Sequence, residues 1–365
     1  MKAHPEIIGY VGLIARGDDI EVTTHGVRER DTPTPVDRHS IFRISSITKP
    51  ILAATALRLV EDELLDLDAP IERYAPELAN RRVLRTFDSE LDDTEPAHRS
   101  PTVRELLTFT WGFGVMMRRP GSTPIQRAYE ALPLCQGRPP MPSLYAAPDE
   151  WMKHLGTLPL MHQPGARWMY HTGAEVAGVV VARAAKKSLG EVMHERVLEP
   201  LGMRDTSFVV PVAKRARFTA AYDHDNSLYD PIDGEWMRAV PFESGAGGLV
   251  STVDDLLAFG RAMQTDRSLD EIHRDHLTEA QRMASLDFVG LLKDHTWGLG
   301  CCINLGTDEA GGPGTFGWDG GLGQVFRVDP NRNVIGALLT NRAMGSPEPP
   351  TVFKDFWESS HRPIS

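Results

Sequence analysis

The chain has 365 residues, of which 41% are hydrophobic and 24% charged. That composition is ordinary for a soluble globular protein, and the length accommodates a large core and two domains or subdomains. The net charge of −11 argues against nucleic acid or an anionic membrane as a partner, and no apolar run approaches transmembrane length.

Two apolar runs near the N-terminus, 7–15 and 20–24, are separated by a Gly-Asp-Asp turn at 17–19. Apolar runs of strand length on either side of a glycine-containing turn predict a β-hairpin. After a polar loop, 42–44 is predicted to be a short extended segment that leads into a helix. The run 51–60 has helix formers, few charges and no glycine, so this helix is expected to be largely buried.

Ser46 and Lys49 lie at the predicted start of this helix. Residues three apart share one helical face, and Ser46 would lie among unbonded N–H groups at the positive end of the helix dipole. A hydroxyl nucleophile needs a basic neighbour to take its proton and donors for the oxyanion. Pro50 is tolerable this early and indicates an irregular first turn. Alone, this short pattern also fits a capping serine and a surface lysine.

The middle of the chain, from about 70 to 235, is predicted to consist of helices joined by long proline-rich loops. The predicted helices cover 103–107, 125–132, 172–185 and 189–198, with a turn at 111–114. The glycines of 245–248 indicate a loop that needs a permissive backbone. A further helix is predicted to begin at 253, with Thr252 as its N-cap.

The last third of the chain is predicted to return to β-structure. Strands are expected at 297–303, 315–318, 324–328 and 334–340, followed by a helix at 351–360. Strands at both ends with helices between them predict one sheet assembled from both termini. We therefore expect a discontinuous α/β domain (1–70 and 236–365), a mostly helical domain (71–235), and an active site in the cleft between them.

The cysteines and histidines do not predict a metal site. Cys135, Cys301 and Cys302 are an odd-numbered set without metal-ligand spacing. We interpret them as reduced residues of a cytoplasmic protein, since the first residues lack the apolar core of a signal peptide, unless such a peptide has been removed ahead of Met1. His273 and His276 share a predicted helix face, but no third ligand is evident, so no metal is expected.

Five segments carry a resemblance to a known family. They are FRISSITKP (42–50), PTVRELLTFTWG (101–112), PGARWMYHTG (164–173) continuing to LEPLGM (198–203), GGLVSTVDDL (247–256) and FGWDGG (316–321). In this order they resemble the serine β-lactamase-related superfamily, nearest to class C β-lactamases, family VIII carboxylesterases and penicillin-binding proteins. The resemblance implies an α/β (α+β) fold of the β-lactamase/DD-peptidase kind, with an antiparallel sheet flanked by helices and an inserted, mostly helical domain.

The resemblance also implies roles for individual residues. Ser46 matches the acylated nucleophile, Lys49 its partner, and Tyr170 the tyrosine of the family's Tyr-x-Asn motif. The backbone N–H groups of Ser46 and Gly321 match the oxyanion hole. Related lactamases share the Ser-x-x-Lys motif, and the identity of their base is disputed.

Two departures from the family pattern are informative. Thr172 stands where the family has asparagine, and a hydroxyl spans less than an amide, so substrate binding and helix capping are both open for it. The segment 318–320 stands where β-lactamases have Lys-Thr-Gly and many esterases have Trp-x-Gly or His-x-Gly. Trp318 supplies no charge and Asp319 adds a negative one, so anionic β-lactams are expected to bind poorly.

The missing second lysine also bears on the base. A free tyrosine has a pKa of about 10, and without a neighbouring cation an ionised Tyr170 is harder to maintain. The sequence therefore favours neutral Lys49 as the base, with its pKa lowered by burial and Tyr170 relaying the proton.

Six residues are predicted to contact substrate. They are Trp111, Phe113, Thr172, Trp318, Asp319 and Gly320. Sheet packing is the alternative for Trp318, and a β-bulge without a ligand is the alternative for Gly320. For Trp111 and Phe113, packing of the loop is an equal alternative. His171 is interpreted as incidental to catalysis.

The predicted function is a serine hydrolase that forms an acyl-enzyme on Ser46, a carboxylesterase for short-chain or uncharged esters with weak or no β-lactamase activity. No metal or organic cofactor is expected. The partner is a small-molecule ester or amide substrate, with neither nucleic acid nor membrane. Alternatives on the same fold are a β-lactamase, a D-aminopeptidase or amidase, and an acyltransferase. A penicillin-binding or inactive interaction protein is the non-enzymatic alternative.

Overall fold

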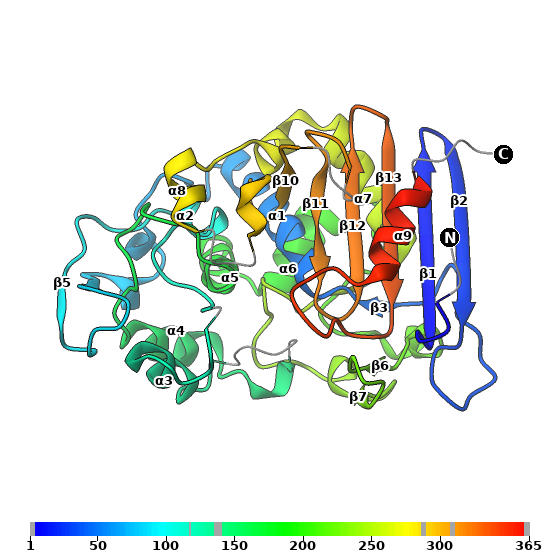
Figure 1. The fold of residues 1–365 in the computed structure, drawn as a ribbon, viewed down its shortest axis with the longest axis horizontal. Helices are drawn as coiled ribbons and strands as arrows, with labels where there is room; N and C mark the ends of the chain where they lie inside the picture. The colour runs from blue at the N-terminus through cyan, green and yellow to red at the C-terminus, as the bar shows by residue number, and fades with distance from the viewer. Residues whose placement is uncertain (1–3, 117, 135–140, 286–289, 307–310, 361–365) are drawn as a thin grey trace.

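A seven-stranded antiparallel sheet organises the computed structural model, which describes residues 4–116, 118–134, 141–285, 290–306 and 311–360 (Figure 1). Its strand order is β2-β1-β13-β12-β11-β10-β9. The strands are β1 (Gly9–Arg16), β2 (Asp19–Gly26), β9 (His295–Trp297), β10 (Cys302–Asn304), β11 (Phe316–Gly320), β12 (Gln324–Asp329) and β13 (Val334–Thr340). Because β1 pairs with β13, the sheet is assembled from both terminal regions, as predicted.

Both faces of the sheet are covered, which explains why β1 and β13 are apolar without alternation. Tyr10 and Ile14 of β1 pack with α9 (Thr351–Ser360), whereas Val11 and Leu13 belong to the main core on the other face. In Figure 1, α9 lies in front of β13 and α7 (Val253–Thr265) lies behind it.

Glycines allow α9 to approach the sheet closely. A Cβ on Gly336 of β13 would lie 2.7 Å from the Trp357 ring, and one on Gly12 of β1 would lie 3.0 Å from the Phe356 ring. The sheet surface under α9 is therefore flat, because the two positions that face the helix rings have no side chain.

Most helices of the middle of the chain lie to the left of the sheet in Figure 1. The remaining α-helices are α1 (Thr48–Glu61), α2 (Val103–Leu107), α3 (Pro124–Glu130), α4 (Pro148–Gly156), α5 (Thr172–Ala185), α6 (Leu189–Met193) and α8 (Glu279–Met283). Short strands pair as β3 (Phe42–Arg43) with β8 (Val250–Ser251), β4 (Arg82–Leu84) with β5 (Thr94–Pro96), and β6 (Ala221–Tyr222) with β7 (Leu228–Asp230). The division into domains at 70/71 and 235/236 stays a prediction.

Short helical turns connect these elements. They are η1 (Ser45–Ile47), η2 (Ile71–Arg73), η3 (Pro76–Leu78), η4 (Pro142–Leu144), η5 (His194–Leu198), η6 (Val212–Arg217), η7 (Glu235–Met237), η8 (Arg267–His273) and η9 (Leu291–Lys293). Among the residues that the structure describes, no helix has the length and apolar character needed to span a bilayer.

The prediction of a single strand at 297–303 is wrong. The segment turns back on itself between β9 and β10, which pair antiparallel. Gly300 has φ +69°, and a Cβ on Gly298 would lie 1.9 Å from the Ile272 carbonyl oxygen, so both positions need glycine. Cys301 and Cys302 are buried, and Cys135 lies outside the described residues.

Candidate active site

The turn that carries Ser46 is fixed from two sides. The Ile44 N–H donates to the Leu249 carbonyl (2.9 Å), and the Leu249 N–H donates to the Thr48 hydroxyl (3.2 Å). Ser45 adopts a left-handed conformation, with φ 49°, which is uncommon for a residue with a side chain. The 3₁₀ turn η1 precedes α1, which begins at Thr48, so the first turn is irregular as Pro50 predicts.

Lys49 lies directly against Ser46. Its Nζ is 2.8 Å from Ser46 Oγ and donates to the Ala246 carbonyl at 2.6 Å. The lysine is fully buried. Burial lowers its pKa to about 7, although the negative charge of Glu175 opposes this shift. A large share of Lys49 is therefore neutral near pH 7 and able to accept a proton.

Tyr170 reaches the same serine from the other side. Its hydroxyl donates to Ser46 Oγ (2.9 Å) and accepts the indole N–H of Trp318 (2.6 Å). Burial raises the pKa of Tyr170 above its ordinary value, so the phenol stays protonated at neutral pH. Because indole is a donor only, the tyrosine oxygen must accept from Trp318 and its own proton is available to Ser46.

We expect Trp318→Phe to reduce the turnover of an ester substrate by about two- to tenfold, the net value of one neutral hydrogen bond. Phenylalanine keeps a ring against Tyr170 (centroids 5.5 Å apart) but removes the N–H that orients its hydroxyl. Trp297→Phe is the matched control, since Trp297 packs against Tyr170 at 6.2 Å and its indole nitrogen has no hydrogen-bond partner in the described structure. Equal losses in the two variants would contradict this role of Trp318.

A strained turn follows Tyr170. The Thr172 N–H donates to the Tyr170 carbonyl (3.2 Å), which closes a γ-turn centred on His171 with φ 79° and ψ −62°. This form of γ-turn is rare and strained. His171 occupies the N-cap position of α5 and Thr172 is its first residue, so the capping alternative for Thr172 is wrong. The buried Thr172 hydroxyl instead lies 3.4 Å from Tyr129 Oη.

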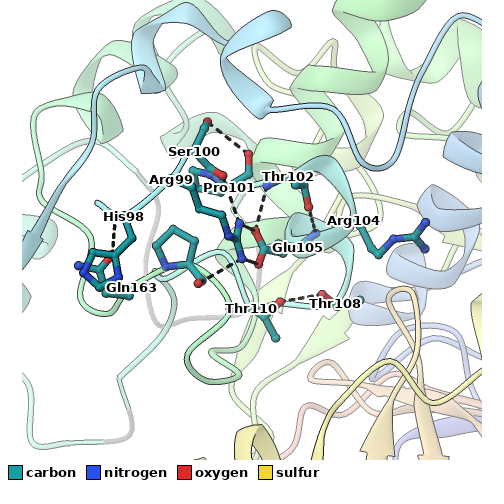
Figure 2. A network of polar contacts seen from close by, with 12 residues as sticks. His98, Arg99, Ser100, Pro101, Thr102, Arg104, Glu105, Thr108, Thr110 and Gln163 are labelled. Carbon is teal, nitrogen blue, oxygen red and sulfur yellow. Dashed lines mark hydrogen bonds and ion pairs between the residues drawn. The ribbon is translucent and has the colours of Figure 1, made fainter. Parts of the chain in front are cut away.

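A polar network holds the segment before Tyr170 (Figure 2). Glu105 accepts the Thr102 N–H in the capping box of α2 and forms a two-pronged ion pair with Arg99 (2.6 and 2.7 Å). Arg99 also donates to the Pro164 carbonyl (3.3 Å). The start of α2 is thereby fastened to the segment that leads to the tyrosine.

The end of β11 lies against the nucleophile turn. A Cβ on Gly320 would lie 2.7 Å from the Ile44 carbonyl oxygen, whereas the space around Gly321 is open. Asp319 is paired with Arg327 on β12 (2.7 Å). The expected negative charge at Asp319 is therefore balanced locally, because adjacent antiparallel strands place these two side chains together.

Three other sequence-predicted residues pack against aromatic side chains. Trp111 and Phe113 are fully buried, and Phe113 packs against Tyr129, so both side chains belong to the core. Contact of either with substrate stays a prediction. His273 stacks on Phe316 (4.4 Å). Within the described ranges, no group of three or more His, Cys, Asp or Glu side chains could hold a metal ion.

Two features of the site were not predicted: the Ala246 carbonyl and the buried carboxylate of Glu175. The predicted loop at 245–248 does not use left-handed glycines. A Cβ on Gly245 would instead lie 2.8 Å from the Ala174 carbonyl and 2.9 Å from Leu52, so the loop needs room between α1 and α5. A single carboxylate in the otherwise apolar start of α5 is the signal that could have identified Glu175.

Comparisons with known proteins identify one family over most of the chain. The family model described as Beta-lactamase matches residues 1–352. A protein of Mycobacterium tuberculosis without assigned function is 36% identical over 342 residues, 87% of this chain and 81% of that protein. Esterase EstB of Burkholderia gladioli is 30% identical over 364 residues, 92% of this chain and 86% of the esterase. The solved structure of EstCE1, a hydrolase with promiscuous acyltransferase activity, matches with a TM-score of 0.76 at 21% identity, over 98% of this chain and 94% of EstCE1.

These matches span the segments on which the resemblance was based, including those that carry Ser46, Lys49 and Tyr170. The antiparallel sheet with flanking helices is also the expected fold. The superfamily and the fold class predicted from the sequence are therefore confirmed. The chain belongs to the β-lactamase family and is a serine hydrolase.

Proposed function

We propose that the protein is a carboxylesterase that acts through an acyl-enzyme on Ser46. The observation that carries the proposal is the convergence of Lys49 Nζ and Tyr170 Oη on Ser46 Oγ, at 2.8 and 2.9 Å. A nucleophile within hydrogen-bond reach of a base, with a second group that orients it, is the arrangement of covalent acyl transfer.

In acylation, Ser46 Oγ attacks the ester carbonyl carbon and its proton passes to neutral Lys49. The tetrahedral intermediate then loses the alcohol, whose oxygen takes a proton from Tyr170; the proton held by Lys49 restores the tyrosine. In deacylation, water gives a proton to the Tyr170–Lys49 pair and attacks the acyl carbon. Ser46 leaves with a proton, so the enzyme returns to its starting state.

The backbone N–H groups of Ser46 and Gly321 are proposed as the oxyanion hole. The space around Gly321 is open, and the close approach of Gly320 to Ile44 brings the end of β11 beside the Ser46 turn. Donors fixed in advance at a developing oxyanion stabilise the transition state by about 3–4 kcal/mol each.

The proposed substrates are uncharged, short-chain esters. Trp318 stands where β-lactamases place a lysine, and it contributes an uncharged N–H that is already bonded to Tyr170. The neighbouring Asp319–Arg327 pair is neutral overall. A substrate carboxylate, such as that of a β-lactam, would lose its hydration without gaining a cation at this position.

Hydrolysis of p-nitrophenyl butyrate and nitrocefin by the wild type and Ser46→Ala tests the proposal. Ester turnover that falls to background in the variant, with little nitrocefin cleavage, is expected. Strong nitrocefin cleavage would contradict the specificity argument, and turnover that survives Ser46→Ala would overturn the mechanism. A rate increase on adding an alcohol acceptor would instead identify an acyltransferase.

A further inference from the structure

Glu175 is a buried carboxylate beside the proposed site that the mechanism above does not use. It lies in the first turn of α5, and only 2% of its side chain is exposed. A buried carboxylate is tolerated only when hydrogen bonds replace its hydration. Its contacts are the Tyr145 hydroxyl (3.0 Å), the Ser244 hydroxyl (2.8 Å), the Ala246 N–H (3.4 Å) and His171 Nε2 (3.5 Å).

These contacts keep Glu175 ionised. Burial alone would raise the pKa of the carboxyl, but the hydrogen bonds from His171, Ser244 and Tyr145 hold it below its ordinary value. Burial and the nearby Lys49 lower the pKa of His171, so the imidazole is neutral and approaches Glu175 as an N–H donor. The carboxylate therefore places a full negative charge close to the catalytic centre.

One peptide group links Glu175 to Lys49. The Ala246 N–H donates to Glu175 Oε2, and the Ala246 carbonyl accepts from Lys49 Nζ at 2.6 Å. Ser244, two residues earlier in the same loop, is bonded to the other carboxylate oxygen. The carboxylate thus anchors the loop whose carbonyl directs the lysine towards Ser46.

We propose that Glu175 is a positioning residue for Lys49. Through the Ala246 peptide it holds Nζ at Ser46 Oγ, and its charge favours the protonated form of the lysine. The proposal rests on the proposed function of Ser46 as the nucleophile. It adds a residue outside the matched motifs that determines the pH range over which the enzyme works.

Among the ionisable groups described around α1, Glu175 is the carboxylate whose charge acts on the pKa of Lys49. Tyr170 and His171 face the lysine from the γ-turn, and Cys302 of β10 faces Tyr170. Asp319 on β11 is paired with Arg327. At the far end of α1, Arg58 pairs with Asp266 beside η8, and Asp62 pairs with Arg196 of η5.

The test is the pH profile of kcat/KM for p-nitrophenyl butyrate in the wild type and in Glu175→Gln. Removing the negative charge makes protonated Lys49 less favourable, so the acid limb, expected near pH 7 in the wild type, should move to lower pH by about one unit. We also expect kcat to fall about tenfold, because an amide replaces the carboxylate that anchors the loop. An acid limb that does not move would overturn the proposal.

Two further variants separate charge from position. Glu175→Asp keeps the charge but withdraws it from the Ala246 N–H, so kcat should fall while the acid limb stays in place. Tyr145→Phe removes a donor to Oε1, whereas the Ala246 N–H donates to Oε2, so the acid limb should again stay in place. If Glu175→Gln does not fold, Glu175→Asp decides, since wild-type kcat in that variant would overturn the positioning role.

A second readout distinguishes failure of this inference from failure of the proposed function. The rate at which a fluorophosphonate labels Ser46 should follow the same acid limb, because it needs deprotonated Lys49 but no ester substrate. If the wild type shows no ester turnover that is lost in Ser46→Ala, the proposed esterase function is refuted. A wild-type and a Glu175→Gln labelling profile with the same midpoint would refute the role of Glu175.

Discussion

Replacing Lys49 with methionine is expected to lower kcat/KM for ester hydrolysis by about 10²- to 10⁴-fold, the range of a lost general base. The lysine Nζ lies 2.8 Å from Ser46 Oγ, and methionine fills a similar volume without a lone pair that accepts a proton. In the wild type, kcat/KM should rise with pH and level off above about 7, the pKa of the buried lysine. The variant should lose this rise together with its activity.

The loss in Lys49→Met should not reflect unfolding. Because burial lowers the pKa of Lys49 in the folded state, the unfolded chain binds its proton more readily, and this group makes the fold less stable as pH falls towards 7. Removing it should leave the free energy of unfolding at pH 7 unchanged or higher. Urea denaturation of both proteins checks this, and a marked loss of stability would contradict the assignment of a largely neutral lysine.

Tyr170→Phe is the comparison that identifies the base. If Lys49 accepts the serine proton, removing the tyrosine hydroxyl should slow acylation by p-nitrophenyl butyrate only a few-fold, because the p-nitrophenolate leaving group needs no proton from Tyr170. The structure supports this order, since burial raises the pKa of Tyr170 while it lowers that of Lys49. Near-total loss of acylation in Tyr170→Phe would show instead that the tyrosine is the base.

Local sequence patterns predicted most of the fold, and they failed where the signals were ambiguous. The hairpin of β1 and β2 turns at Gly17, which has φ +60°, as its position between two apolar runs indicates. The pair β9 and β10 was predicted as one strand because it is apolar throughout, and the two glycines of its turn were not interpreted as a reversal. Helix α4 was missed inside a proline-rich region, although Pro148 at its start and two acidic residues in its first turn are helix signals.

The site was predictable only in part, because spacing along the chain does not report distance across a fold. Ser46 and Lys49 are three residues apart and meet within one turn, whereas Tyr170 was placed beside them only through the family resemblance. The partner of Asp319 depends on strand register: β12 pairs Val325 with Asp319, which brings Arg327, two residues further on, to the diagonal position. No property of 318–321 alone specifies that register.

A buried ion pair fixes the strand that leads to Ser46. Arg43 on β3 and Asp230 at the end of β7 have side chains only 2% and 3% exposed, and the Arg43 Nε–H donates to the Asp230 carboxylate at 3.1 Å. Arg43 also donates to the Thr219 carbonyl (2.7 Å). Its guanidinium lies 4.2 Å from the Phe218 ring centroid and 4.9 Å from that of Trp236.

Asp230→Ala should therefore lower the free energy of unfolding by about 3–5 kcal/mol, because it leaves a desolvated guanidinium without its counter-charge. Arg38→Met is the matched control: Arg38 bonds Asp254 at 2.7 Å, but the two side chains are 42% and 34% exposed, so its loss should cost no more than about 1 kcal/mol. Urea denaturation measures both.

Combining Asp230→Ala with Arg43→Met should recover part of the loss, since the orphaned charge is then gone. The free-energy losses of Asp230→Ala and Arg43→Met, measured separately, would add up in the double variant if packing, rather than the ion pair, held β3 in place.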